Sequence, residues 1–182
     1  MHKKSLAAVL LVLLAVGCAP QRAPVKPPAA ITGAPKKGPV LSRTEMRRRI
    51  LAAHNAWRKR LKVPPLQWSE PLAKFAQQWA DTLQGQGCDP EHRPANKYGE
   101  NIEWAGNQNL TPEKVVDLWG GEGKSYNYAA NSCQAGKNCL HYTQIVWADT
   151  TKVGCGVARC ANSEVWVCNY APPGNWVGKK PY

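Results

Sequence analysis

The chain has 182 residues, of which 43% are hydrophobic and 20% charged, and it contains eight Trp. This length fits one ordinary domain with an appended segment, and the composition excludes a chain that is disordered throughout. The net charge of +12 is uneven, because every acidic residue lies at Glu45 or later and the first 44 residues carry only basic charges.

The N-terminus has the features of an export signal. Two lysines precede an apolar run over residues 6–16, which is too short to span a membrane but fits the core of a signal peptide. Small residues then lead to Cys18, as in a bacterial lipobox. We therefore predict a lipoprotein signal peptide over residues 1–17 and an acylated Cys18 that holds an exported bacterial lipoprotein on a membrane. Ala19 favours the outer membrane, and the alternative is an ordinary signal peptide with a coincidental cysteine.

The next segment is rich in proline. Residues 19–40 contain six prolines, two glycines and no acidic residue, and proline fixes φ and lacks an amide hydrogen. We predict an extended tether over residues 18–42, whose basic side chains contact anionic headgroups or form only a solvated spacer. In the globular domain, residues 43–182, the 18 Lys and Arg exceed the 12 Asp and Glu only moderately. Export also argues against nucleic acid as a partner.

The globular domain combines helical and strand patterns. Apolar residues at helical spacing predict a helix over residues 42–62 with a basic outer face, and Ser69 caps a second helix. Residues 111–112 open a third helix, whose end is weakened by glycines. A turn at residues 161–163 joins the last two of three predicted strands, which cover residues 98–104, 152–160 and 164–170. Helices with a small sheet predict the α+β class.

Six further cysteines lie in the exported domain, where oxidation is favoured. Their even number argues against a nucleophilic thiol, and the lack of a CxxC pair argues against a metal site. We predict three disulfides, although the spacing alone allows fifteen pairings of Cys88, Cys133, Cys139, Cys155, Cys160 and Cys168.

Histidines and glutamates form the second group of candidate functional residues. His54 lies on the apolar face of the first helix and is interpreted as a hydrogen-bonded core residue. His92 lies in a proline-bounded loop and His141 opens a short helix, so packing requires neither imidazole. Glu100 begins a strand and Glu122 lies on the core-facing side of the third helix, where a carboxylate needs a partner. These loop histidines and inward carboxylates lie together in one polar cleft, or they are scattered and each is hydrogen-bonded by other groups.

Four motifs resemble those of the CAP superfamily, which includes cysteine-rich secretory proteins, antigen 5 and the plant pathogenesis-related proteins of class one. In family order, they are residues 99–102 (GENI), 119–126 (WGGEGKSY), 141–147 (HYTQIVW) and 165–176 (VWVCNYAPPGNW). The likeness covers about residues 45–182 and leaves out the signal peptide and the tether.

The resemblance implies an α–β–α sandwich with a three-stranded antiparallel sheet between helical layers. It also implies a cleft tetrad whose two histidines can bind Zn²⁺: His92, Glu100, Glu122 and His141. The chain departs from the family beside the first histidine, where Arg93 and Pro94 replace a frequent serine. The cysteine spacing is closest to the plant branch, which implies the pairs Cys88–Cys160, Cys133–Cys139 and Cys155–Cys168.

The tetrad suggests two functions of different classes. Two imidazoles and water make an open Zn²⁺ site beside which a glutamate can act as general base, so a zinc-dependent hydrolase is one hypothesis. Against it, the sequence lacks HExxH, a third strong ligand and a Ser–His–Asp arrangement. The family is also associated with lipids and protein partners. We therefore favour an envelope-anchored binding module for a lipid, an envelope polymer or a protein over an enzyme.

Overall fold

The structure is a computed structural model that describes residues 41–182. The predicted signal peptide, the acylated Cys18 and the tether up to residue 40 lie outside the described residues, so they stay predictions. The elements, in chain order, are α1 (Arg43–Arg60), β1 (Gln67–Trp68), α2 (Glu70–Gly85), β2 (Gly99–Gly106), α3 (Pro112–Gly121), the 3-10 turn η1 (Glu122–Ser125), β3 (Tyr126–Asn127), β4 (Ser132–Cys133), α4 (Leu140–Ile145), β5 (Lys152–Arg159) and β6 (Ser163–Ala171).

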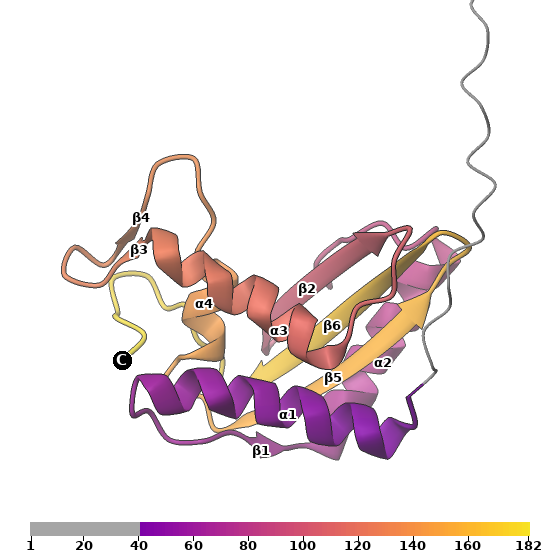
Figure 1. Cartoon of the computed structure of the whole chain (residues 1–182), viewed down its shortest axis with the longest axis horizontal. Helices are drawn as coiled ribbons and strands as arrows, with labels where there is room; N and C mark the ends of the chain where they lie inside the picture. The colour runs from indigo at the N-terminus through magenta and orange to yellow at the C-terminus, as the bar shows by residue number, and fades with distance from the viewer. Residues whose placement is uncertain (1–40) are drawn as a thin grey trace, which may run out of the picture. The chain divides into compact units, whose positions relative to one another are not determined.

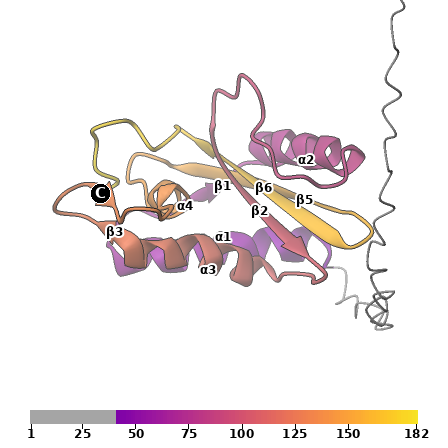
Figure 2. The same cartoon turned by 90° about the horizontal axis from the view of Figure 1, so that it is seen from above.

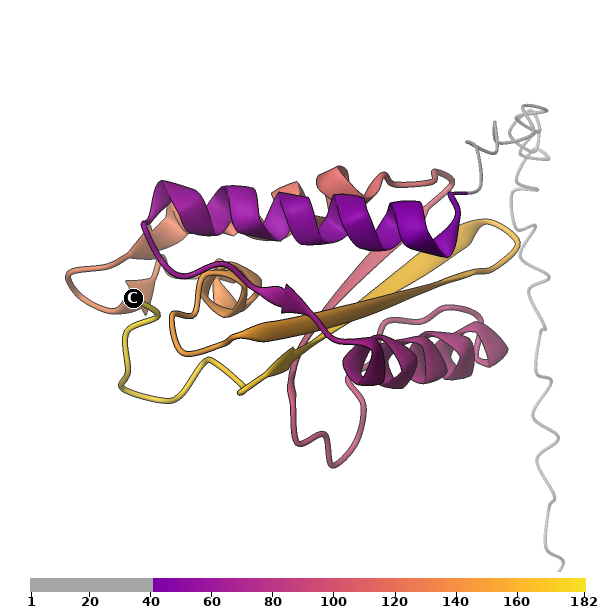
Figure 3. The same cartoon turned by 90° about the horizontal axis from the view of Figure 1, so that it is seen from below.

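The described chain forms three layers, in which a central sheet lies between two layers of helices (Figure 1). The strand order is β1-β5-β6-β2, with α1 and α3 side by side on one face and α2 on the other (Figures 2 and 3). The α–β–α sandwich with antiparallel β5, β6 and β2 confirms the predicted fold class. The sheet differs from the prediction by the short parallel strand β1 beside β5, because two residues are too few to show a periodic pattern.

The main helices begin at the capping residues that the sequence predicts. Ser42, Ser69 and Thr111 each accept a hydrogen bond from the amide three residues later, at 3.1, 3.4 and 3.2 Å. The stripe by which α2 is buried against the sheet consists of Leu72, Ala76, Ala80 and Leu83.

Two glycines of β5 allow α2 to lie close to the sheet. A Cβ at Gly154 would collide with the backbone of Ala73, and one at Gly156 would collide with the backbone of Gln77. The Gln77 side chain also bonds the outer edge of β5, because it accepts a hydrogen bond from Val157 N at 3.1 Å and donates one to Val157 O at 3.0 Å. The approach of α2 to β5 is therefore fixed both by backbone contact and by a side-chain amide.

The basic outer face predicted for α1 does not include Arg58, which is completely buried. Arg58 follows Ile50 and His54 at intervals of four residues, so it belongs to the buried stripe of the helix. Burial lowers the pKa of Arg58 to about 10, which leaves the side chain charged at neutral pH. Its guanidinium donates at 2.6 to 3.5 Å to the backbone carbonyls of Pro64, Ile145, Trp147, Ala148 and Thr150.

His54 is a satisfied core residue, as the sequence predicts. Its Nδ1 lies 2.7 Å from the Ile50 carbonyl oxygen, and its Nε2 lies 2.9 Å from the Tyr170 hydroxyl. Burial lowers the pKa of His54 to about 4, because the core disfavours the charged imidazolium. His54 is therefore neutral in the folded protein at neutral pH.

Acid should destabilise the protein through His54. The unfolded state binds a proton at this residue below about pH 6.5, whereas the folded state binds one only near pH 4. The free energy of unfolding should therefore fall as the pH drops from about 6.5 to 4, by on the order of 3 kcal/mol. Urea denaturation at several pH values measures this, and His54→Gln should flatten the curve in that window. An equal slope in the variant would assign the acid sensitivity to other groups.

Three disulfides form between the pairs that the resemblance implies: Cys88–Cys160, Cys133–Cys139 and Cys155–Cys168. The first pair is separated by 72 residues and ties the loop after α2 to the end of β5. The second closes a short loop that ends at Cys139, immediately before α4. The third joins paired positions of β5 and β6.

Candidate functional site

The first histidine–carboxylate pair lies where the loop after α2 meets the start of β2. His92 Nδ1 lies 2.8 Å from Glu100 Oε1, with the His92 side chain 67% exposed and the Glu100 side chain only 5% exposed. Three further donors bond the same carboxylate, namely Arg93 N at 3.0 Å, Asn96 Nδ2 at 2.9 Å and Asn169 Nδ2 at 3.2 Å. Glu100 is therefore a fully hydrogen-bonded buried carboxylate that holds His92 at the surface.

Contacts with α2 hold the loop that carries His92. Trp79 Nε1 donates to the Glu91 carbonyl at 2.7 Å, and Arg93 Nη1 donates to the Phe75 carbonyl at 3.1 Å. The Arg93 guanidinium also lies over the Phe75 ring, 3.7 Å from its centroid. In the sequence, Arg93 stands out only as a departure from the family motif, but its backbone amide binds Glu100 and its side chain anchors the loop.

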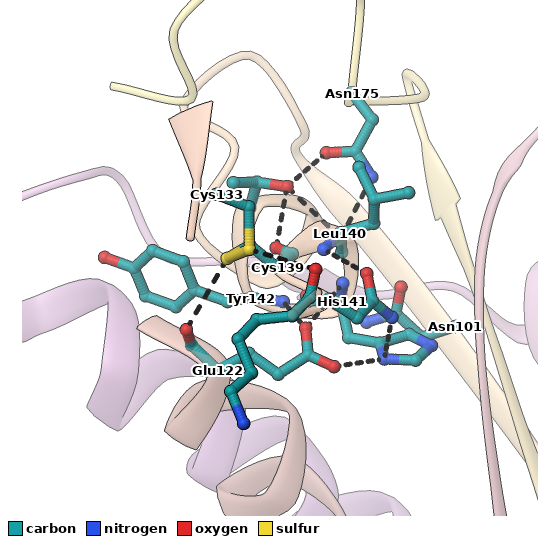
Figure 4. Close-up of polar contacts among 11 residues, drawn as sticks. Asn101, Glu122, Cys133, Cys139, Leu140, His141, Tyr142 and Asn175 are labelled. Carbon is teal, nitrogen blue, oxygen red and sulfur yellow. Dashed lines mark hydrogen bonds and ion pairs between the residues drawn. A yellow bond between two sulfur atoms is a disulfide. The ribbon is translucent and has the colours of Figure 1, made fainter. Parts of the chain in front are cut away.

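The second pair lies between α3 and α4 (Figure 4). Glu122 Oε1 lies 2.7 Å from His141 Nδ1, while Oε2 accepts hydrogen bonds from the backbone amides of His141 at 3.0 Å and Tyr142 at 3.2 Å. No side chain at the capping position Cys139 bonds the first turn of α4. The carboxylate therefore caps that turn and orients the imidazole at the same time.

Glu122 reaches this position in a different way from the one predicted. The sequence places it on the core-facing side of the third helix, whereas α3 ends at Gly121 and Glu122 begins the turn η1. The side chain thereby reaches α4 rather than remaining along α3. It is 18% exposed, so its partner has to be polar.

Strand β2 links the two pairs through neighbouring residues. Glu100 belongs to the first pair, and Asn101 Nδ2 donates to the His141 carbonyl of the second at 3.1 Å. Successive side chains of a strand point to opposite faces, so the side chains of Glu100 and Asn101 leave β2 on opposite faces and reach the two pairs separately. The structure thus brings both pairs into contact with the start of β2.

A third carboxylate near the second pair was missed by sequence reasoning. Glu103 shares the face of Asn101, because the two residues are two positions apart on β2. Burial raises the pKa of Glu103, an effect that Glu122 reinforces and that His141 opposes. The alternation of side chains along the predicted strand would have identified it.

The two histidines fit part of a zinc site. Each directs Nδ1 to a glutamate, and a carboxylate in this position commonly orients a metal-binding imidazole whose other nitrogen faces the metal. The same bond raises the pKa of His92, first through the hydrogen bond itself and further through the charge of Glu100. Among residues 41–182, however, no group of three or more His, Cys, Asp or Glu side chains is arranged to hold a metal ion. His92 and His141 would be the protein ligands, and zinc held there would supply a Lewis acid with positions open to water.

Within the described part of the chain, no helix is both long and apolar enough to cross a bilayer.

Comparisons with known proteins agree with the motifs. The sequence profile of the cysteine-rich secretory protein family, CAP, matches residues 51–170. A PR-1 type pathogenesis-related protein of Sambucus nigra is 42% identical over 131 residues, which cover 71% of this chain and 78% of the relative. Pathogenesis-related leaf protein 6 of Solanum lycopersicum is 44% identical over 133 residues, which cover 72% of this chain and 80% of the relative.

Solved structures show the same fold. The venom allergen-like protein 4 of Schistosoma mansoni superposes with a TM-score of 0.64 at 29% identity, over 78% of this chain and 95% of that protein. A crystal structure of NaASP2 with Zn²⁺ gives a TM-score of 0.63 at 26% identity, over 82% and 90% of the two chains. Motifs, disulfides, layers and relatives all agree, and the chain belongs to the cysteine-rich secretory protein (CAP) family, with a domain of the PR-1 kind.

Proposed function

We propose that this CAP domain is a binding module displayed on a bacterial cell envelope, and that its two histidine–glutamate pairs form the recognition site. The ligand classes that fit are a lipid, an envelope polymer or a protein partner. Residues 1–17 would direct export, an acyl group on Cys18 would hold the chain on a membrane, and residues 18–42 would serve as the tether.

One observation carries the proposal, namely that both imidazoles are oriented in advance by buried or capping carboxylates. Glu100 accepts hydrogen bonds from three groups besides His92, and Glu122 accepts two backbone amides besides His141. Imidazoles that are fixed in this way at a partly open surface suit the recognition of a ligand, because little side-chain entropy is lost on binding.

A zinc-dependent hydrolase is the second candidate, and Glu103 favours it. A partly buried carboxylate of raised pKa near His141 suits a general base, since its pKa lies closer to neutral pH than that of an exposed glutamate. A peptide and ester panel assayed with and without Zn²⁺ separates the two functions. Turnover that is lost in Glu103→Gln would support the hydrolase, while ligand binding without turnover would support the module.

Zinc binding tests the site itself. In isothermal titration calorimetry at pH 7.5, His92→Ala and His141→Ala should each remove measurable Zn²⁺ binding, because each removes one of two ligands. Glu100→Gln should weaken binding by about 10- to 100-fold, because His92 is then oriented less firmly. Since Glu100 raises the pKa of His92, protons should displace Zn²⁺ as the pH falls through a value above the ordinary histidine pKa of about 6.5.

Glu91→Gln provides the matched control for zinc binding. Glu91 is adjacent to His92, and its contribution to the loop is a backbone carbonyl bond to Trp79, so losing its charge should leave Zn²⁺ affinity nearly unchanged. Binding that survives in both histidine variants would show that the metal is held elsewhere.

Membrane anchoring is tested separately by Cys18→Ala. The variant should be released from membranes or accumulate as an uncleaved precursor, as judged by fractionation and mass spectrometry. Cys18→Ala protein that stays in the membrane fraction at its mature mass would contradict acylation, whatever the result for zinc.

A further inference from the structure

The C-terminal segment exposes a compact apolar surface at one end of the domain. Leu140, Trp176 and Val177 are the most exposed large hydrophobic residues of the described chain, at 63%, 57% and 102%. All three line one hollow of about 340 Å³ between α4 and the C-terminal segment. Large apolar side chains that gather in the open indicate a contact surface rather than an ordinary part of the exterior. We call Leu140, Trp176 and Val177, with Lys137, Lys179 and Lys180, the tryptophan tip.

Hydrogen bonds to the rest of the domain hold the tryptophan tip in its exposed position. Asn175 accepts a hydrogen bond from Thr143 Oγ1 at 2.6 Å and donates one to the Leu140 carbonyl at 2.9 Å, which ties the segment to α4 (Figure 4). Lys179 N donates to the Trp176 carbonyl at 3.0 Å and closes a turn that has Val177 at its apex. The turn is thus held in place while its apolar side chains remain outside.

Further bonds fix the chain on the far side of the turn. Asn131 Nδ2 donates to the Lys179 carbonyl at 3.1 Å, and Ala148 N donates to the Pro181 carbonyl at 2.7 Å. Tyr182 stacks on Tyr128 with ring centroids 4.7 Å apart. Docking through the tip would therefore require little ordering of the backbone, which lowers the entropy cost of binding.

The charge around the tip has one sign. Lys137 and Lys179 line the hollow, and no Asp or Glu of the described chain does so. Lys180 lies over the Tyr128 ring, 4.5 Å from its centroid. None of these three lysines forms an ion pair among residues 41–182. The surface thus offers free cations around an apolar apex and favours an anionic partner.

We propose that the tryptophan tip docks on a bilayer surface that carries anionic lipid headgroups. Trp176 and Val177 enter the interface between headgroups and acyl chains, and the lysines contact phosphate groups. Tryptophan with flanking lysines is the pattern of side chains at such interfaces. An aliphatic apex such as Val177 suits insertion into acyl chains better than stacking on a sugar ring. This contact goes beyond the proposed function, because neither the histidine–glutamate pairs nor Cys18 takes part in it.

Fluorescence quenching by brominated lipids tests the docking. All eight Trp lie at position 57 or later, so the signal reports on the folded domain, whatever the first 40 residues do at the membrane. With the full chain on brominated phosphatidylcholine vesicles that contain phosphatidylglycerol, Trp emission should be quenched. Quenching should drop by at least half in Trp176→Ser and should be largely lost without phosphatidylglycerol or at high salt.

Trp104→Ser is the matched control, because Trp104 is similarly exposed, at 46%, but lies on β2 outside the tip. It should leave the lipid-dependent quenching unchanged. Val177→Asp keeps Trp176 and should still reduce quenching, because it places a charge at the apex. Equal quenching in the native chain and in Trp176→Ser would overturn the proposal. So would protection of Trp176 from aqueous acrylamide by soluble peptidoglycan fragments but not by vesicles, which would assign the tip to a glycan.

Discussion

Replacing Arg58 with Met should lower the free energy of unfolding by about 3 to 5 kcal/mol, because removal of a buried hydrogen-bonded cation leaves its partners unpaired in the core. Five backbone carbonyls, at Pro64 and from the end of α4 to Thr150, lose the guanidinium as a donor. Methionine fills much of the volume but offers no hydrogen. Urea denaturation at neutral pH measures the change.

Two further variants separate the lost hydrogen bonds from lost charge. Arg58→Lys keeps a cation but has fewer donors in a different geometry, so its loss of stability should be intermediate. Lys59→Met removes a charge from the neighbouring exposed position of α1 and should change stability by less than about 0.5 kcal/mol. If Arg58→Met were as stable as the native chain, the buried guanidinium would contribute no net stability, as happens when apolar packing replaces a buried charge well.

Removing the Cys88–Cys160 disulfide by a double Ala substitution should cost about 4 kcal/mol. The bond closes a long loop, with a sequence separation of 72 residues, and the entropy that it removes from the unfolded chain grows with loop length. The loop that carries His92 begins directly after Cys88, so Zn²⁺ binding should weaken in the same variant. Denaturant titration under oxidising conditions measures the stability.

The Cys133–Cys139 pair provides the comparison. Its sequence separation is only 6 residues, so its double Ala variant should lose about 2 kcal/mol on the same argument. A larger loss for the short loop than for the long one would show that native contacts, rather than the constraint on the unfolded chain, determine the stabilisation.

Local chemistry made much of the fold predictable from the sequence. Ser69 followed by Pro71 marks the start of α2, and the spacing of Leu72, Ala76 and Ala80 identifies its buried face. Strand β1 was missed because its pairing with β5 depends on tertiary contact. The burial of Arg58 was not predicted, although its four-residue spacing from His54 places it on the buried stripe of α1.

The residues of the candidate site could be predicted from the sequence, but the contacts that hold them in place could not. Loop histidines without a packing role and inward glutamates point to mutual satisfaction, and the structure pairs His92 with Glu100 and His141 with Glu122. The sequence does not indicate that Glu122 caps α4, because that contact needs the turn after Gly121. Their role in binding stays a prediction.

The close approach of α2 to β5 has a consequence for the position of His92. His92 is attached to α2 through its loop, which two hydrogen bonds tie to that helix. A methyl group at Gly154 or Gly156 would push α2 outward and carry His92 with it, without touching either histidine. Two glycines beneath a helix thus help to set the position of a histidine that lies in a loop beyond that helix.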